Sequence, residues 1–107
     1  HIIDPLGYFE FMKLVKYSKA VITDSGGIQE ESTFLGVPCL TIRPNTERPV
    51  TIAIGTNTLL SLDVEEILKH IILINSGNYK KGDKPVFWDG KATERIIEII
   101  LNKIFKL

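Results

Sequence analysis

The chain has 107 residues, 44% of them hydrophobic and 24% charged, which is typical of one globular domain. Its thirteen basic and thirteen acidic residues balance, so no net charge attracts nucleic acid or an anionic membrane. No apolar stretch approaches the roughly 20 residues that span a bilayer, and no signal-peptide pattern is present. We therefore expect no nucleic-acid or membrane partner, and a local set of donors must hold any bound anion.

The start of the chain and its single cysteine carry further information. The chain begins at His1 without a methionine, and Ile2-Ile3 is typical of the end of a buried strand, which indicates an excised piece of a longer protein. Cys39 can form no disulfide within the chain, which fits a reducing, cytoplasmic location. The apolar neighbours of Cys39 predict that it packs in the core.

Helices and strands alternate along the first part of the chain. Apolar spacing and β-rich runs predict a helix over 8–18, a strand over 20–23, a turn over 24–27, a helix ending at 35 and a strand over 37–42. Gly36 ends the second helix and Pro38 prevents its resumption. Such βαβ units with short connections predict an α/β fold with a parallel sheet and flanking helices.

The second part predicts a polar loop over 43–57, a short strand over 57–62, a helix from 63 to about 75 and a last helix from about 92. Asp63 as N-cap with Glu66 at the third helical position matches a capping box. A loop as long as 43–57 in a compact domain more often has a function than serves only as a connection. No repeat or second domain is apparent, so residues 1–107 are expected to form a single domain.

The strongest chemical signal lies where the strand over 20–23 meets the next helix. In parallel α/β sheets, ligands gather at the carboxyl ends of strands, where helix amino termini direct free N–H groups outward. Gly26 and Gly27 let a phosphate approach the backbone, and the Ser25 hydroxyl adds a donor. The pattern is neither the dinucleotide fingerprint nor a P-loop. A phosphate site and a simple turn capped by Ser25 or Asp24 are both open interpretations.

Two glutamates and two arginines are further candidates. Glu31 follows Gly27 by just over one helical turn, and its carboxylate could accept two hydrogen bonds from ribose hydroxyls. The alternative is a glutamate that complements the helix dipole, which is our interpretation of Glu30. Arg43 and Arg48 lie in a loop stiffened by two prolines and carry the side chain best shaped for phosphate. Simple solvation is the alternative for both arginines.

The remaining polar and aromatic residues carry less weight. We expect His70 and the lysines between 80 and 84 to be solvated. Trp88 either stacks on a base or packs under the last helix, and we expect packing. No metal-ligand spacing and no nucleophile–base pair is apparent, so we expect no catalytic residue, metal or cofactor in this chain.

Several segments, taken together, resemble the non-hydrolysing UDP-N-acetylglucosamine 2-epimerases and cover essentially the whole chain. These segments are Asp4-Pro5-Leu6-Gly7-Tyr8-Phe9, Thr23-Asp24-Ser25-Gly26-Gly27-Ile28-Gln29-Glu30-Glu31, Leu35-Gly36-Val37-Pro38, Thr46-Glu47-Arg48-Pro49, Gly55-Thr56-Asn57, and Trp88-Asp89-Gly90-Lys91-Ala92 leading into Arg95-Ile96. The combination of the second and fourth segments is specific to that family.

The resemblance implies the Rossmann-like, UDP-binding C-terminal half of a two-domain fold of the glycosyltransferase-B type. The residues that it places at UDP are Phe11 near the uracil, Glu31 at the ribose, Ser25, Gly26 and Gly27 at the diphosphate, and Arg48 in the phosphate region. Where family members often have a polar residue near the base and a glutamate after Arg-Pro, this chain has Leu6 and Val50.

The activity that the resemblance implies is that of an isomerase. In such enzymes UDP is eliminated from UDP-N-acetylglucosamine to give 2-acetamidoglucal, and UDP then re-adds with the opposite configuration at C2, giving UDP-N-acetylmannosamine. The proton-transfer groups come chiefly from the missing N-terminal domain, so the fragment alone is expected to be inactive. The implied partners are UDP or a UDP-N-acetylhexosamine and that missing domain, in an enzyme that can form a homodimer.

Two other functions are open. The sugar-nucleotide domain of a glycosyltransferase shares the architecture, but many such domains carry a second glutamate eight positions after the first. Here those positions are Pro38 and Cys39, which argues against that version. The other alternative is a free-standing, non-enzymatic nucleotide-binding module.

Overall fold

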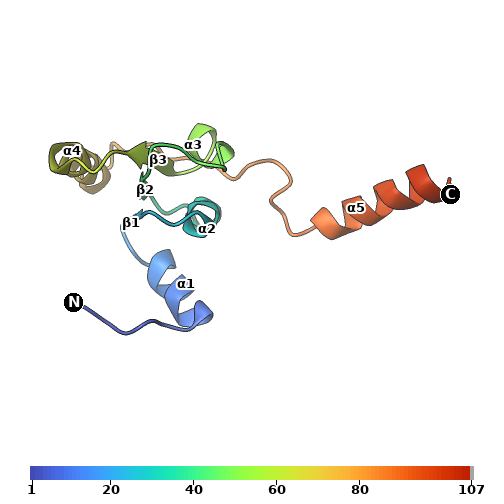
Figure 1. Ribbon diagram of the computed structural model, residues 1–107, viewed down its shortest axis with the longest axis horizontal. Helices are drawn as coiled ribbons and strands as arrows, with labels where there is room; N and C mark the ends of the chain where they lie inside the picture. The colour runs from blue at the N-terminus through green and yellow to red at the C-terminus, as the bar shows by residue number, and fades with distance from the viewer. Residues whose placement is uncertain (107) are drawn as a thin grey trace.

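The computed structural model describes residues 1–106 and is built around a parallel three-stranded sheet. The strands are β1 (Val21–Thr23), β2 (Cys39–Ile42) and β3 (Asn57–Leu60), in the order β1-β2-β3 (Figure 1). Val21 pairs with Cys39, and Cys39 pairs with Asn57, so the carboxyl ends of all three strands meet at one edge. The predicted parallel α/β sheet is confirmed.

Helices connect and flank these strands. They are α1 (Tyr8–Lys16), α2 (Gly27–Leu35), α3 (Val50–Ala53), α4 (Val64–Asn75) and α5 (Ala92–Ile100), which continues into the π-helical turn η1 (Leu101–Phe105). Helix α2 contacts α1, α3, β2 and β3, so it is the central helix of the domain. Helix α5 extends away from the sheet (Figure 1). No helix within residues 1–106 has the length and apolar character needed to cross a membrane.

Most predicted boundaries agree with the structure, and three local expectations are wrong. Ile2 and Ile3 are exposed and lie outside any strand, so they do not form the end of a buried strand. Gly36 has a φ of 72° and ends α2, as predicted. The segment 43–57 is not a continuous loop, because α3 begins after Pro49, whose ring fixes a φ suited to a helix start. Asp63 caps α4 by accepting from the Glu65 amide at 3.0 Å. Glu66 does not complete a capping box, since its carboxylate accepts from the Ser61 hydroxyl at 2.7 Å.

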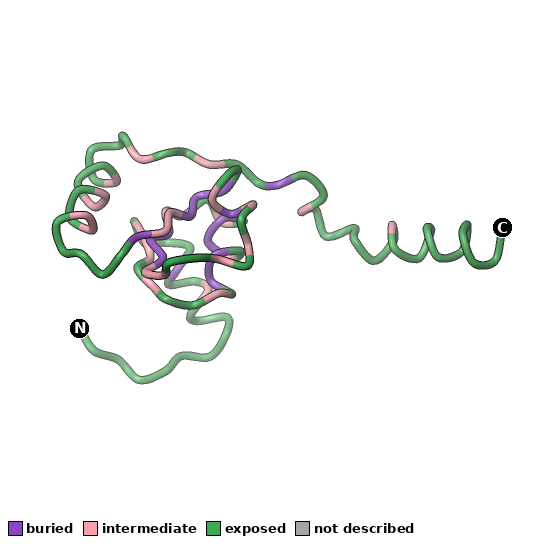
Figure 2. The backbone as a smooth tube through the Cα atoms, turned by 45° about the horizontal axis from the view of Figure 1, so that its top comes forward, coloured by how far each residue is buried: buried purple, intermediate pink, exposed green. Residues whose placement is uncertain are grey.

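Buried residues gather in the sheet region, and Figure 2 marks them in purple. This core contains both apolar and polar residues. Its apolar members are Val15, Ile28, Val37, Cys39, Leu40 and Leu60. Cys39 is a free, fully buried thiol, which confirms its expected place in the core. The buried polar members are Gln29, Ser32, Thr33, Thr41, Thr51, Thr56 and Asn57. Buried polar groups are retained when they are hydrogen-bonded, so the core is held by specific pairs as well as by apolar contact.

Two of the lysines expected to be solvated are exposed, as predicted, and also contact the domain. Lys80 donates to the carbonyl oxygens of Ile52, at 2.9 Å, and of Asn57, which ties the segment after α4 to α3 and β3. Burial lowers the pKa of the Lys80 ammonium. The ammonium of Lys84 lies 4.4 Å from the centre of the Phe34 ring, a cation–π contact. The lysine-rich segment therefore packs on the sheet domain.

Candidate functional site

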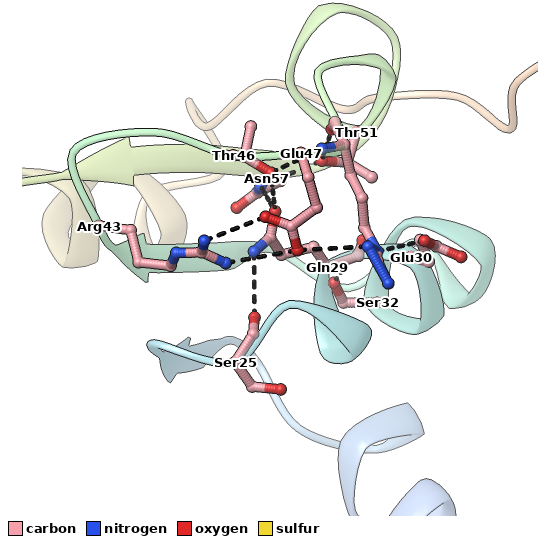
Figure 3. A network of polar contacts seen from close by, with 10 residues as sticks. Ser25, Gln29, Glu30, Ser32, Arg43, Thr46, Glu47, Thr51 and Asn57 are labelled. Carbon is pink, nitrogen blue, oxygen red and sulfur yellow. Dashed lines mark hydrogen bonds and ion pairs between the residues drawn. The ribbon is translucent and has the colours of Figure 1, made fainter.

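The turn between β1 and α2 lies at the carboxyl edge of the sheet. Gly26 occupies the N-cap position of α2, so the interpretation of Ser25 or Asp24 as the cap is wrong. The Ser25 amide donates to the Thr23 hydroxyl at 3.0 Å, which fixes the start of the turn. The Ser25 side chain is exposed, and its hydroxyl points away from the neighbouring polar network (Figure 3). The start of α2 therefore has donors that no N-cap side chain satisfies.

A cluster of charged side chains lies beside this turn. Arg43 pairs with Glu47, with 3.0 Å between Nη2 and Oε2. Arg48 pairs with Glu47 as well, at 3.3 Å between Nη1 and Oε1, and its Nε pairs with Glu30 on α2. Glu30 is thus more than a partner of the helix dipole, since it anchors the arginine loop to α2. Neither arginine is simply solvated.

The Glu47 carboxylate pairs with both arginines of this cluster. Its pKa is held below the ordinary value by a hydrogen bond from its own backbone amide and by the Arg43 guanidinium, with smaller contributions from the charges of Arg43 and Arg48. Glu47 is therefore ionised at neutral pH. The carboxylate lies next to Gly26, which places negative charge over the glycine turn.

A polar network whose members are buried, except for the half-buried Thr46, connects the turn to the arginine loop (Figure 3). We define it as Gln29, Thr41, Thr46, Thr51 and Asn57, whose side chains hydrogen-bond to one another across α2, β2, the loop, α3 and β3. Sequence reasoning missed this network. Polar residues at strand and helix positions could have indicated it. Gln29, Thr46 and Asn57 also all lie in the segments that resemble the family.

A cavity of about 620 Å³ opens between α1 and α2. Its lining residues are Tyr8, Met12, Lys13, Lys16, Tyr17, Glu30, Glu31, Phe34, Leu35 and Trp88. The candidate ribose ligand Glu31 thus faces a space lined by aromatic rings. Trp88 lies at this cavity, although we expected it to pack under the last helix.

The structure brings some of the candidate residues together and leaves others apart. Arg48 pairs with Glu30 on α2. It also pairs with Glu47, whose carboxylate lies beside Gly26. Glu31 lines the cavity on α2, whereas the glycine turn does not contribute to the cavity lining. Phe11 is on α1, 42% exposed, and is also outside that lining.

A parallel sheet whose first strand ends in a glycine turn, with a loop that carries two arginines beside that turn, defines an α/β protein of the Rossmann-like class. The chain belongs to the UDP-N-acetylglucosamine 2-epimerase family, whose family-level pattern matches residues 1–101.

Individual relatives agree with this assignment. The UDP-N-acetylglucosamine 2-epimerase of Methanocaldococcus jannaschii is 45% identical over 100 residues, which are 92% of this chain and 26% of that protein. The Bacillus subtilis protein of the same name is 39% identical over 105 residues, which are 94% of this chain and 28% of that protein. The chain therefore spans about a quarter of the length of the curated relatives it matches.

Solved structures show the same fold. The crystal structure of Methanocaldococcus jannaschii UDP-GlcNAc 2-epimerase in complex with UDP-GlcNAc and UDP has a TM-score of 0.77 at 44% identity, over 92% of this chain and 26% of that one. A putative epimerase from Listeria monocytogenes has a TM-score of 0.81 at 35% identity, over 100% of this chain and 30% of that one. These neighbours confirm the expected Rossmann-like part of a glycosyltransferase-B-type fold.

Proposed function

We propose that this chain is the UDP-binding part of an isomerase that interconverts UDP-N-acetylglucosamine and UDP-N-acetylmannosamine. The observation that carries the proposal is the 44% identity to a structure solved with UDP-GlcNAc and UDP, together with the glycine turn and arginine loop at one sheet edge. In this proposal the missing N-terminal domain closes the other side of the active site.

The turn and loop would hold the diphosphate. The start of α2 offers backbone donors and the positive end of the helix dipole, and Gly26 and Gly27 have no Cβ to keep an anion away. The exposed Ser25 hydroxyl can donate to the same phosphates. Arg48 supplies a guanidinium already oriented by two carboxylates.

The nucleoside would lie toward α1. Glu31 faces the cavity between α1 and α2, where its carboxylate can accept from the two ribose hydroxyls. We assign Phe11, partly exposed on α1, to the neighbourhood of the uracil. Trp88 and Tyr8 supply further aromatic surface on the cavity wall.

The proposed reaction determines what this chain contributes. Loss of the C2 proton and cleavage of the C1–O bond, with the electron pair leaving on the UDP oxygen, gives 2-acetamidoglucal. Return of UDP to C1 and of a proton to the opposite face of C2 gives the epimer. The two steps balance without an oxidant, so no cofactor is required. This chain stabilises the departing diphosphate, and we assign proton transfer to the other domain.

The proposal extends to cell location and assembly. A buried free cysteine fits a cytoplasmic enzyme, and nucleotide-activated hexosamines are the donor form used in polysaccharide biosynthesis. We assign no membrane or nucleic-acid partner. A homodimer of the full-length enzyme would be measured by analytical ultracentrifugation.

Incubating the full-length protein that contains this chain with UDP-N-acetylglucosamine tests the proposal. We expect UDP-N-acetylmannosamine, detected by proton NMR, with free UDP and 2-acetamidoglucal as released intermediates. Transfer of the sugar to an acceptor, without epimer, would instead support the glycosyltransferase alternative. Binding of UDP without either product would support the non-enzymatic module.

A further inference from the structure

We propose that Gln29 is a positioning residue that joins the two parts of the phosphate site, the turn at Ser25–Gly27 and the loop at Arg43–Pro49. This inference rests on the proposed function, because it concerns how the UDP site is held in shape. Gln29 lies between the two glutamate candidates and the glycine turn on α2 but is itself fully buried, so it is not a ligand of UDP.

The two ends of the Gln29 amide bond to different parts of the site (Figure 3). Its Nε2 donates to the Ser25 carbonyl oxygen at 3.0 Å. Its Oε1 accepts from the Thr46 hydroxyl at 2.6 Å and from Asn57 Nδ2 at 3.0 Å. A single side chain therefore holds the turn, the loop and β3 together.

The connection continues to the arginine that we assign to the phosphates. The Thr46 hydroxyl that donates to Gln29 also accepts from the Arg48 backbone amide at 3.0 Å. The path from Ser25 to Arg48 thus consists of Gln29, Thr46 and three hydrogen bonds. Moving the loop relative to the turn would break one of them.

Asn57 fixes the orientation of the Gln29 amide through its own hydrogen bonds to neighbouring side chains. Its Nδ2 donates to the Thr51 hydroxyl at 3.1 Å in addition to Gln29, and its Oδ1 accepts from the Thr41 hydroxyl at 2.5 Å. The amide of Gln29 therefore has a defined orientation, because Asn57 offers it a donor and Ser25 offers it an acceptor. A side chain with an acceptor alone or a donor alone could not satisfy both.

A site that stabilises a leaving diphosphate depends on donors placed before the ligand arrives. Because every polar atom of Gln29 is used and the side chain is shielded from water, the loop has no equally good alternative position. We infer that Gln29 sets the relative position of Arg48 and the glycine turn.

The test uses the full-length protein and the variants Gln29→Met and Thr46→Val, which remove the connection at two places. UDP affinity is measured by calorimetry well below the melting temperature of each variant. We expect both variants to bind UDP about tenfold more weakly or worse. The control is Thr56→Val, the same substitution at a fully buried hydroxyl, which donates to the Val37 carbonyl oxygen outside the path.

A double-variant cycle separates positioning from general stability. If Gln29 positions Arg48, then Arg48→Ala should weaken UDP binding less in the Gln29→Met background than in the wild type. Amide hydrogen exchange over residues 46–48 should also increase in Gln29→Met without ligand. A merely structural role would lower the melting temperature while leaving affinity and the effect of Arg48→Ala unchanged.

The outcomes distinguish this inference from the proposed function. Wild-type protein that binds no UDP would overturn both. Wild-type binding with unchanged affinity in Gln29→Met and Thr46→Val would overturn the positioning role alone. If Gln29→Met does not fold, the UDP affinity of Thr46→Val tests the positioning role. That variant breaks the hydrogen-bonded path from Ser25 to Arg48 at the loop and leaves the Gln29 side chain in place.

Discussion

The Glu47 carboxylate lies directly over Gly26, so that a Cβ added to Gly26 would be 2.5 Å from Glu47 Oε1. Arg43 and Arg48 hold the carboxylate in this position. An anion of the protein thus occupies the space above the turn to which we assign the diphosphate. Binding of UDP would require Glu47 to move, which would free Arg43 and leave Arg48 held by Glu30 alone.

Glu47→Gln should therefore tighten UDP binding by the full-length protein, because a neutral amide no longer repels the diphosphate. Calorimetry with UDP measures the change. Weaker binding would show that the main effect of Glu47 is to orient Arg43 and Arg48.

The pH dependence provides the control for Glu47. Its pKa lies below the ordinary 4.5, so Glu47 is ionised at neutral pH. A terminal phosphate has a second pKa of about 6, so the difference between wild type and variant should be constant only from about pH 7.5 to pH 8.5, where UDP is also fully ionised. The difference should shrink as the pH falls through the lowered pKa, because protonated Glu47 is neutral, like glutamine. A difference that changes where UDP is fully ionised would point to another group.

Arg48→Ala should weaken UDP binding more than Arg43→Ala. We expect the Arg48 variant to lose about 1.5–3 kcal/mol of binding free energy, the range for a charged hydrogen bond. Arg48 is tied to α2 through Glu30, whereas Arg43 pairs with Glu47 alone among the ion pairs of residues 1–106. Equal losses, or the reverse order, would mean that the phosphate ligand in this loop is assigned wrongly.

Glu31→Gln should weaken UDP binding while barely changing folding stability, because a ribose ligand needs a carboxylate that accepts from two hydroxyls. A helix-dipole partner would instead cost about 0.3–1 kcal/mol of stability and leave affinity unchanged. Glu31 is the fifth residue of α2, beyond its first turn, which already disfavours the dipole role.

The control for Glu31 must avoid Glu30, since Glu30 pairs with Arg48. Glu65, in the first turn of α4, is a suitable glutamate, and Glu65→Gln should leave UDP affinity unchanged. With 2′,3′-dideoxy-UDP, the difference between wild type and Glu31→Gln should largely disappear. Its persistence would show that Glu31 does not contact the ribose.

The isolated 107 residues should bind UDP weakly and show no epimerase activity, because the opposing side of the proposed cleft is absent. Calorimetry with UDP and a product assay with UDP-N-acetylglucosamine measure the two parts. Turnover by this chain alone would contradict the division of roles between the two domains.

Gly55→Ala should destabilise the fold by about 1–3 kcal/mol, the usual cost of overpacking. Gly55 is buried, and an added Cβ would overlap the Thr33 side chain and lie 2.6 Å from the Thr51 carbonyl oxygen. Urea denaturation measures the loss. At Gly27 an added Cβ meets nothing within 4 Å, so Gly27→Ala serves as the stability control.

Local signals in the sequence were sufficient for the order of the strands and of the longer helices, the glycine turn and the end of α2 at Gly36. Each depends on residues a few positions apart, whose backbone preferences act before the chain folds. The same signals led to one wrong expectation in the 43–57 segment, because α3 is a single turn too short to show periodicity.

The tertiary structure alone decided how the site is held. Gln29 meets Thr46 from 17 positions away and Asn57 from 28, and both contacts depend on the parallel register of β2 and β3. Glu30 pairs with Arg48 because the loop places Arg48 against α2. Lys80 contacts the domain because the segment after α4 lies against β3. Composition and spacing specify which side chains are available, whereas pairing between distant segments determines which of them meet.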